Sequence, residues 1–281
     1  MTTKKRADEV LSLQQAAELL GVHYMTAYRY VRTGRLPATQ SGGVWRVRRS
    51  NLDTLARPAV AGRTKVGATT DRRHYVRKLT ERLVQGDETE AWRVTQQALA
   101  SGCSPEDLYL DVLGPGLRRV GEEWAAGRIS VAEEHRASAV MQRLIGRLGP
   151  LFTRRGRKRG VVVLGAPTND FHGLATALVA DVLRGRGFSV TDLGGNTPAA
   201  SFAETLGAAT RPIATGVVVS APVRDAEIAA TIAAIKASSP APVLLGGLKI
   251  RDAAHARRLG ADAWTDSARA AVDWFDAIAR P

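Results

Sequence analysis

Residues 161–173, with the sequence VVVLGAPTNDFHG, decide the fold of the second half of the chain. The apolar run at 161–165 has the length of a buried strand, and turn-forming residues follow it at once. In an open α/β sheet, the loop after such a strand lies at the edge that binds ligands. We therefore expect His172 to face a ligand crevice, with Asp170 holding its second ring nitrogen.

The pattern of an apolar run followed by a helical stretch repeats along the rest of the chain. Four more apolar runs occur, each followed by an Ala-rich helical stretch, at 188–193, 214–220, 242–246 and 261–265. Strands that alternate with helices predict a parallel, doubly wound sheet of the flavodoxin-like kind over residues 160–281. Ser220, Gly246 and Gly247 follow strand ends, where small residues let the backbone approach a ligand closely.

Residues 72–150 predict a helical domain. Short breaks at 85–87, 101–105 and 114–116 leave room for four segments of suitable length. We therefore expect an all-α domain, a four-helix bundle, directly before the sheet domain.

Within this helical domain, Trp124 precedes Glu134 and His135 in a Trp-x9-Glu-His pattern near the end of a helical segment. Taken alone, a tryptophan and a charged pair on helices are more often core and solvated surface than a site. The pattern gains meaning from its position directly before a sheet domain that offers a histidine at its ligand edge.

Residues 9–57 predict a winged helix-turn-helix. Ser12 is a suitable N-cap for a helix over 13–20, and a second helix over 24–32 follows a glycine turn. A β-hairpin over 38–48 would form the wing, and Trp45 would pack this wing onto the helices. The stretch at 58–70, rich in Pro, Ala and Gly, reads as a linker.

In a winged helix-turn-helix, the second helix enters the major groove and the wing reaches phosphates. The candidate DNA contacts are therefore His23, Thr26, Tyr28, Arg29 and Arg32 on the helix, and Arg46, Arg48 and Arg49 on the wing. One such unit buries little DNA surface, so specific binding to double-stranded DNA calls for a homo-oligomer, a dimer or a tetramer.

Charge supports this interpretation. The chain carries a net charge of +13, and residues 1–65 hold twelve Lys and Arg against four acids. Such a local excess indicates a polyanionic partner, with nucleic acid favoured over a membrane; a merely solubilising surface is the alternative.

Composition excludes several classes of protein. At 281 residues and 44% hydrophobic, the chain can build more than one core, and its single cysteine excludes a disulfide framework. No window is apolar enough to span a membrane, so we expect a cytoplasmic protein. No nucleophile triad, P-loop or zinc cluster occurs, so we expect no enzyme.

The sequence around His172 resembles the Asp-x-His-x-x-Gly motif of cobalamin-binding domains, with Ala175 in the last Gly position. The stretch 13–55 resembles excisionase and MerR-type winged helices. With the Trp-x9-Glu-His pattern between them, the whole chain resembles the cobalamin-binding photoreceptor regulators of the CarH/LitR type.

This resemblance implies adenosylcobalamin bound base-off, with His172 as the lower ligand of the cobalt. Trp124 would cover the upper face of the corrin ring, and Glu134 and His135 would shape the space for the adenosyl group. The remaining cofactor-binding residues would be Asp170, Ser220, Gly246 and Gly247. The function implied is a transcription regulator that responds to light and cobalamin, because photolysis alters its oligomeric state and its affinity for DNA.

One departure leaves alternatives open. In this family the residue after the tryptophan is often a histidine that captures the cobalt after photolysis, and here it is Ala125. The alternatives are a photocobilin-type photoreceptor that adds a bilin such as biliverdin, a corrinoid methyl-carrier protein, and a regulator that has lost cobalamin binding. The N-terminal unit argues against the carrier, and the Asp170-His172 pair argues against the loss.

Overall fold

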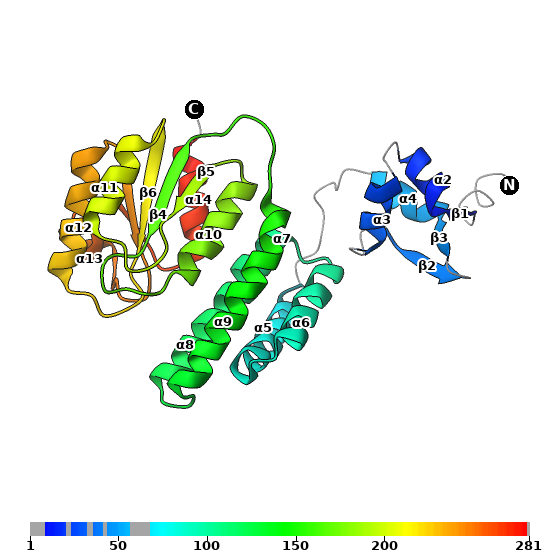
Figure 1. Cartoon of the computed structure of the whole chain (residues 1–281), viewed down its shortest axis with the longest axis horizontal. Helices are drawn as coiled ribbons and strands as arrows, with labels where there is room; N and C mark the ends of the chain where they lie inside the picture. The colour runs from blue at the N-terminus through cyan, green and yellow to red at the C-terminus, as the bar shows by residue number, and fades with distance from the viewer. Residues whose placement is uncertain (1–8, 21–23, 33–35, 42–43, 57–67, 280–281) are drawn as a thin grey trace. The chain divides into compact units, whose positions relative to one another are not determined.

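The computed structural model describes residues 9–20, 24–32, 36–41, 44–56 and 68–279. The chain divides into two compact units, one of residues 1–69 with 100–102 and one of residues 70–99 with 103–281. Figure 1 shows their helices and strands, and each unit is described by itself. No helix in the described ranges is both long and apolar enough to cross a bilayer.

The first unit combines helices with a small antiparallel sheet. Its elements are β1 (Val10–Ser12), α2 (Leu13–Leu19), α3 (Tyr24–Arg32), β2 (Ala38–Ser41), β3 (Val44–Arg48) and α4 (Arg49–Ala56). The strand order is β1-β3-β2, so the predicted β2–β3 hairpin is confirmed. Strand β1 was not predicted, because three residues carry no alternation and pair only through the tertiary contact of Leu11 with Val47.

The sequence predicted the start of α2 correctly. Ser12 accepts a hydrogen bond from the Gln15 backbone N–H, and the Gln15 side chain accepts one from the Ser12 N–H. This capping box satisfies two donors that a helix end otherwise leaves unpaired. Trp45 of β3 packs against the core that holds Leu13 and Leu36, as expected for a side chain that fixes the wing.

The second unit begins with helices. They are α5 (Ala68–Gln85), α6 (Glu88–Ala100), α7 (Pro105–Leu108), the π-helical η1 (Tyr109–Leu113), α8 (Gly114–Ala125), α9 (Val131–Leu148) and the 3₁₀-helical η2 (Gly149–Phe152). The predicted breaks at 85–87 and 101–105 are confirmed. The predicted break at 114–116 is wrong, because η1 runs straight into α8 and Pro115 lies in the first turn, where its missing N–H costs nothing.

A five-stranded sheet completes this unit. Its strands are β4 (Val161–Gly165), β5 (Ser189–Asp192), β6 (Pro212–Val218), β7 (Val243–Gly246) and β8 (Ala263–Thr265), in the order β5-β4-β6-β7-β8. All neighbouring pairs are parallel. The predicted parallel, doubly wound sheet is confirmed, and its order is the one found in flavodoxin-like folds.

Helices cover both faces of the sheet (Figure 1). The helices after the strands are α10 (Leu174–Gly185), α11 (Ala199–Ala208), α12 (Asp225–Ser238), α13 (Ala253–Arg258) and α14 (Ala268–Ile278). Val162 and Leu164 pack on the side of α10 and α14, whereas Val163 packs on the side of α11 and α12. Alternate strand residues thus fill two separate cores, which explains the continuous apolar run.

The helical part and the sheet share one core, which runs from Leu79 of α5 to Phe275 of α14. The buried Tyr109 hydroxyl donates to Asp181 of α10 at 3.0 Å and lies 3.2 Å from the Ile145 carbonyl oxygen. Burial, followed by the charge of Asp181, raises the pKa of Tyr109. The side chain therefore stays protonated and fixes η1 against α10.

Ion pairs reinforce this junction at its rim. Arg186, after α10, pairs with Glu106 of α7 at 2.5 Å and with Asp273 of α14 at 3.2 Å. Arg269 of α14 pairs with Asp107 and Asp111 at 3.1 and 2.9 Å. Because each of the two arginines pairs with more than one acid, these contacts position α7 and η1 on the sheet domain more firmly than isolated surface pairs would.

The Tyr109 contact can be tested by Tyr109→Phe. We expect the free energy of unfolding to fall by roughly 1–2 kcal/mol, because the buried Asp181 loses a hydrogen-bond donor. Urea denaturation of the whole chain measures this change. Tyr75→Phe is the matched control, since its hydroxyl lies 3.4 Å from the Gln97 carbonyl oxygen in an exposed position and should contribute less than about 0.5 kcal/mol. Equal effects of the two substitutions would contradict the role given to Tyr109.

Candidate functional site

The loop between β4 and α10 lies at the carboxyl edge of the sheet, next to the loop after β5. The backbone N–H of Asn169 donates to the side chain of Asn196 at 2.9 Å, and the Thr197 N–H donates to the Ala166 carbonyl. Asn169 and Asn196 have φ values of 70° and 53°, a left-handed conformation that asparagine tolerates better than most residues. Two adjoining loops therefore hold each other in a defined shape.

Asp170 is the buried centre of this edge, with none of its surface exposed. One carboxylate oxygen accepts from the His172 backbone N–H at 3.1 Å, and the other from the N–H groups of Ser220 and Ala221 at 2.5 and 3.1 Å. Burial alone would raise the pKa of Asp170, but the hydrogen bonds from His172, Ser220 and Ala221 hold it below its ordinary value. Asp170 therefore stays ionised and ties the loop after β4 to the loop after β6.

His172 lies above this carboxylate. Its Nδ1 is 2.7 Å from the first oxygen of Asp170, which is the hydrogen bond that the sequence predicts. The side chain is 57% exposed, and its Nε2 contacts no hydrogen-bonding partner among the residues that the structure describes. The hydrogen bond to Asp170 raises the pKa of His172, burial opposes it, and the charge of Glu134 adds to the rise. The ring is thus oriented by one nitrogen while the other faces outward.

Two large apolar side chains at this edge were not predicted. Phe171 is 74% exposed and Leu248, after β7, is 58% exposed. Single exposed apolar residues are common, but two at the ligand edge of a doubly wound sheet indicate a surface meant to be covered. The sequence did offer a reason to consider Phe171, because it stands between the two residues of the expected Asp170-His172 pair.

The helical site residues lie on either side of a tight turn. Trp124 is the penultimate residue of α8, whereas Glu134 and His135 lie in the first turns of α9. The prediction that the Trp-x9-Glu-His pattern lies near the end of one helix is therefore wrong. The pattern spans the connection between two helices.

The sequence of this turn explains its shape. Gly127 has a φ of 68°, and the N–H groups of Gly127 and Arg128 donate to the carbonyls of Trp124 and Glu123. This is the Schellman pattern that ends α8. Ser130 then starts α9 with a capping box to Glu133. Hydrogen bonds between residues close in sequence therefore end α8 just after Trp124 and start α9 six residues later.

The site residues at the end of α8 and at the start of α9 differ in how far their side chains are exposed. Trp124 is 48% exposed, His135 has a side chain 75% exposed, and Glu134 is more covered and accepts from the Ser138 hydroxyl at 2.7 Å. The charge of Glu134 acts on the pKa of His172, so the start of α9 lies within electrostatic reach of the loop after β4. The structure thus brings Glu134, Asp170, His172 and Ser220 to one region.

The two predicted glycines have an explanation within the sheet itself. A Cβ on Gly247, whose φ is 103°, would lie 2.3 Å from the Val219 carbonyl oxygen. A Cβ on Gly246 would lie 3.1 Å from the Thr265 carbonyl oxygen. At Gly194, by contrast, nothing lies within 4 Å of such an atom, so this left-handed glycine borders open space.

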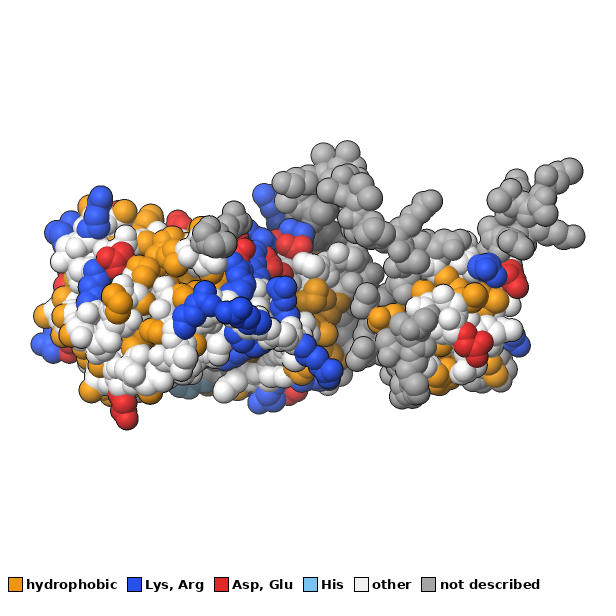
Figure 2. All heavy atoms as spheres, turned by 90° about the horizontal axis from the view of Figure 1, so that it is seen from above, with side chains coloured by type: hydrophobic (Ala, Val, Ile, Leu, Met, Phe, Trp, Pro, Cys, Tyr) orange, Lys and Arg blue, Asp and Glu red, His pale blue; other side chains and the backbone are white. Residues whose placement is uncertain are grey.

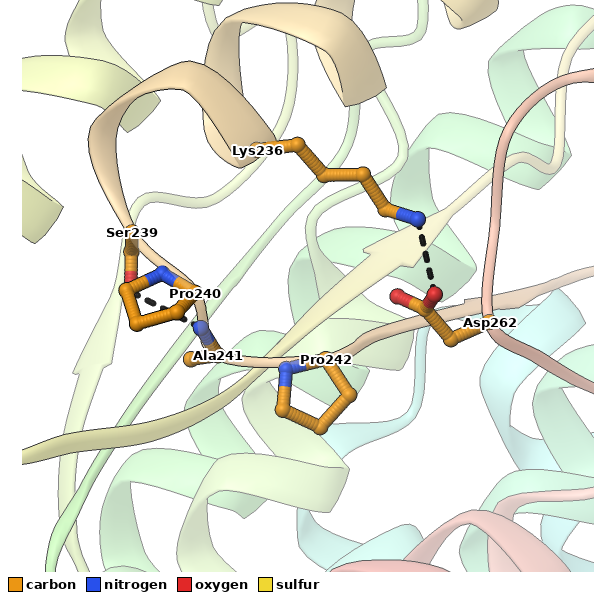
Figure 3. Close-up of a pocket in the computed structure, with 6 residues that line it drawn as sticks. All are labelled: Lys236, Ser239, Pro240, Ala241, Pro242 and Asp262. Atoms are coloured by element: carbon orange, nitrogen blue, oxygen red, sulfur yellow. Dashed lines mark hydrogen bonds and ion pairs between the residues drawn. The ribbon is translucent and has the colours of Figure 1, made fainter.

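The hollow drawn in Figure 3 lies elsewhere, where the chain enters β7 and β8. Lys236 pairs there with Asp262 at 2.7 Å, and the Ala241 N–H donates to the Ser239 hydroxyl (Figure 3). The polar groups of this hollow satisfy one another, and it contains none of the predicted site residues.

The predicted DNA contacts fall in the first unit. Arg46 and Arg48 are exposed on β3, as expected for a wing. Arg49 is not on the wing, because it is the first residue of α4 and pairs with Glu9 at 3.0 Å. Tyr28 is half-buried on α3. Thr26, Arg29 and Arg32 lie on α3, but their side chains are outside the described residues, as is the whole of His23.

Two family matches identify parts of the chain. Residues 75–148 match the family described as B12 binding domain, and residues 10–58 match the family described as helix-turn-helix domain. The chain thus joins a helix-turn-helix domain to a B12-binding domain. The first match covers α5 to α9, with Trp124 and Glu134, and stops before the sheet that carries His172.

Two corrinoid proteins are among the relatives that resemble this chain. A Trimethylamine corrinoid protein 1 from Methanosarcina acetivorans is 29% identical over 132 residues, which cover 46% of this chain and 61% of that protein. The corresponding protein from Methanosarcina mazei is 27% identical over 137 residues, covering 48% and 63%. The matches thus span about three fifths of the relatives' own length. The expectation that the chain is not an enzyme fits these relatives, which are named as corrinoid proteins.

The fold has a counterpart among solved structures. The monomethylamine corrinoid protein of Methanosarcina barkeri superposes with a TM-score of 0.62 at 18% identity, over 72% of this chain and 97% of that one. The similarity supports the arrangement of helices followed by a five-stranded parallel sheet.

The glycine at the end of β7 can be tested by Gly247→Ala. The added methyl meets the Val219 backbone in a left-handed conformation, so we expect a loss of roughly 2–4 kcal/mol in the free energy of unfolding. Urea denaturation measures the loss. Gly207→Ala, within α11 and with nothing within 4 Å, is the control and should be neutral or stabilise by up to about 1 kcal/mol. An unchanged free energy of unfolding in Gly247→Ala would contradict the clash with the Val219 backbone as the reason for this glycine.

Proposed function

We propose that this protein is a DNA-binding transcription regulator that holds a cobalamin between α8–α9 and the carboxyl edge of the sheet. The observation that carries the proposal is the His172 ring, oriented by a buried carboxylate, in a chain that also has a helix-turn-helix domain. We retain the division into residues 9–57, 72–150 and 160–281 as DNA-binding, cap and cofactor-binding parts, with the four helices of the middle part as a bundle.

The residues present suit a corrinoid. The outward Nε2 of His172 is of the donor type that binds cobalt, and the carboxylate on Nδ1 is the usual support of a ligating imidazole. Phe171 and Leu248 on the sheet side, and Trp124 on the helical side, are the exposed apolar surfaces that a corrin ring would cover. The open space beside Gly194 leaves room for the nucleotide tail of the cofactor.

Within this proposal, each cofactor-binding residue has a defined task. His172 would hold the cobalt through its outward Nε2, and Asp170 would keep the ring in place. Trp124 would pack against the corrin ring from the helical side, where Glu134 and His135 would also border the cofactor. Gly246 and Gly247 shape the loop after β7, and Ser220 anchors Asp170 through its N–H group.

Adenosylcobalamin, when bound, would supply both the absorption of visible light and a weak cobalt–carbon bond. Ala125 offers no imidazole to the upper face. The regulatory step that we propose is linkage: a cap position that depends on the upper group favours association of protomers, and several DNA-binding units together bind more tightly than one.

A corrinoid methyl-carrier is the second candidate, favoured by the relatives, which are named as corrinoid proteins. The helix-turn-helix match favours the regulator, because a carrier needs no DNA contact. A photocobilin-type receptor with a bilin is a third variant. Burial, followed by the charge of Asp107, raises the pKa of the half-buried Cys103 to about 11, so a thiolate for covalent attachment is disfavoured at neutral pH.

The cobalt ligand is tested by His172→Ala. We expect the absorption spectrum of a histidine-ligated, base-off cobalamin to disappear and the affinity for adenosylcobalamin to fall at least about tenfold. Because the side chain is 57% exposed, the fold should survive, which circular dichroism checks. His74→Ala on α5 is the control and should keep the wild-type spectrum. An unchanged spectrum in His172→Ala would exclude this histidine as the ligand.

The wing is tested by the double variant Arg46→Gln/Arg48→Gln. Both side chains are exposed on β3, so we expect weaker binding to a long duplex of mixed sequence, by about tenfold at low salt. Fluorescence anisotropy measures the affinity. Arg257→Gln/Arg258→Gln on α13 removes the same charge from another exposed surface and should bind like wild type. Equal losses in both variants would indicate a net-charge effect and no wing contact.

Light gating is tested on the full chain loaded with adenosylcobalamin, in the dark and after green light. We expect a change in the absorption spectrum together with a change in mass on size-exclusion chromatography and in DNA affinity. Binding without any change in assembly or DNA affinity would favour the carrier or a bilin-dependent variant. Absence of cobalamin binding would overturn the proposed function.

A further inference from the structure

A strongly basic segment joins η2 to β4. Five of the six residues at 154–159 are Arg or Lys, and the segment from 153 to 160 contains no acidic, aliphatic or aromatic side chain. Residues 154–158 are exposed. Figure 2, which looks down on this end of the molecule, shows a broad group of Lys and Arg side chains here. We call residues 154–159, together with Arg211, the basic edge.

The shape of the basic edge is fixed by a few contacts. Arg159 pairs with Asp276 of α14 and lies 4.4 Å from the ring of Phe188. The Lys158 ammonium donates to the Arg154 carbonyl at 2.8 Å, and the Arg154 guanidinium donates to the Arg186 carbonyl at 3.3 Å. One carboxylate and several carbonyls thus hold the segment against the sheet domain.

Most of its charge stays unpaired. Among the residues that the structure describes, no acidic side chain pairs with Arg154, Arg155, Arg157, Lys158 or Arg211. Arg184, Arg186 and Arg269 of the same unit each pair with aspartate or glutamate, whereas other exposed arginines such as Arg257 and Arg258 carry no ion pair in the described structure either. The basic edge differs from these in density, because five cations fall within six residues and no acidic residue lies among them. Such a concentration of positive charge attracts a polyanion.

The basic edge also has a concave part. Arg157, Lys158, Arg159 and Arg211 line a shallow hollow whose apolar wall is formed by Ile213, Ile278 and Ala279. Arg211 is held there in a left-handed conformation, with a φ of 59°. Cations that converge on a hollow can surround a phosphate group, and the planar guanidinium suits two of its oxygens at once.

The chemistry favours a phosphodiester backbone over other polyanions. A membrane surface would call for several exposed aliphatic or aromatic side chains that insert among the lipids. The segment from 153 to 160 has none, Ile213 and Ile278 of the hollow are only partly exposed, and Leu151 is a single exposed leucine before the segment. Five cations within six residues, three of which line one hollow, can contact several neighbouring phosphates of a duplex at once. The basic edge precedes β4 and β6, at the amino ends of the strands, so it does not compete with the carboxyl edge that holds His172.

We infer that the basic edge is a second DNA-contacting surface, which binds phosphates without reading sequence, in addition to the helix-turn-helix unit. This inference rests on the proposed function as a DNA-binding regulator. It gives the cofactor-binding unit its own contribution to DNA affinity. Sequence-independent contacts of this kind steepen the salt dependence of binding.

The test compares wild type with the triple variant Arg155→Gln/Arg157→Gln/Lys158→Gln in the full chain. These side chains carry no ion pair in the described structure, so the fold should be kept. Affinity for a long duplex of mixed sequence is measured by fluorescence anisotropy between about 50 and 200 mM salt. We expect affinity to fall about tenfold or more, and the slope of log affinity against log salt to lessen by about 2–3 units.

A matched control separates local contact from net charge. The triple variant Lys78→Gln/Arg257→Gln/Arg258→Gln removes the same charge from exposed positions on α5 and α13, and we expect it to keep the wild-type slope. Equal losses in both triple variants would overturn the inference, because they would reflect net charge alone.

The outcomes also distinguish this inference from the proposed function. One outcome would overturn the inference and leave the proposed function intact. In it, wild type binds DNA, the wing variant binds more weakly, and the basic-edge variant keeps the wild-type dependence of affinity on salt. If wild type binds no duplex at all, both fail. If only the basic-edge variant loses binding to phosphatidylcholine vesicles that contain phosphatidylserine, and its DNA binding is unchanged, the surface belongs to a membrane and the inference is overturned.

Discussion

The candidate site depends on the buried carboxylate of Asp170. Removed from water, it stays ionised because its two oxygens accept the N–H groups of Ser220 and Ala221 and both the backbone N–H and the ring of His172. A buried charge is tolerated only with such compensation, so the loops after β4 and β6 must keep their positions relative to each other. The orientation of the His172 ring follows from this requirement.

The second unit as a whole also has one end that is held by many contacts and another end that is exposed. At one end, Tyr109 and the network around Arg186 fasten the helices to the sheet. At the other end, Trp124 and Phe171 remain largely exposed. Apolar surface that a protein leaves uncovered at a ligand edge is available to a flat, largely apolar ligand.

Much of the fold could be predicted from local patterns. All five strands of the parallel sheet lie within the predicted apolar runs or within two residues of them. The inner strands β4, β6 and β7 are largely buried on both faces and therefore contain few polar residues, whereas the edge strand β5 is only partly covered. The start of α2 at the N-cap Ser12 could likewise be predicted from the sequence. The errors have definite causes: Gly114 and Pro115 look like a break but open a helix, and β1 is too short to show alternation.

The site was predicted only in part. The spacing of Asp170 and His172 was enough to expect their hydrogen bond, since two residues of one loop meet by local geometry. The bonds from Ser220 and Ala221 to the same carboxylate join residues about fifty positions apart, and no local pattern encodes them. Likewise, the position of Arg49 beside Glu9 depends on how β1 pairs with β3.

The sequence by itself determined the classes of secondary structure, the alternation that makes the sheet parallel, and the residue types at its ligand edge. These properties follow from apolar periodicity, helix caps and turn residues, which act over a few positions. Only the tertiary structure decided that the Asp170 carboxylate is fully buried and that Gly247 is required by the Val219 backbone. It also decided that the charges at 154–158 have no acidic partner within the described part of the chain. Burial and pairing depend on chain segments that meet only after folding, so they cannot be read from any one segment.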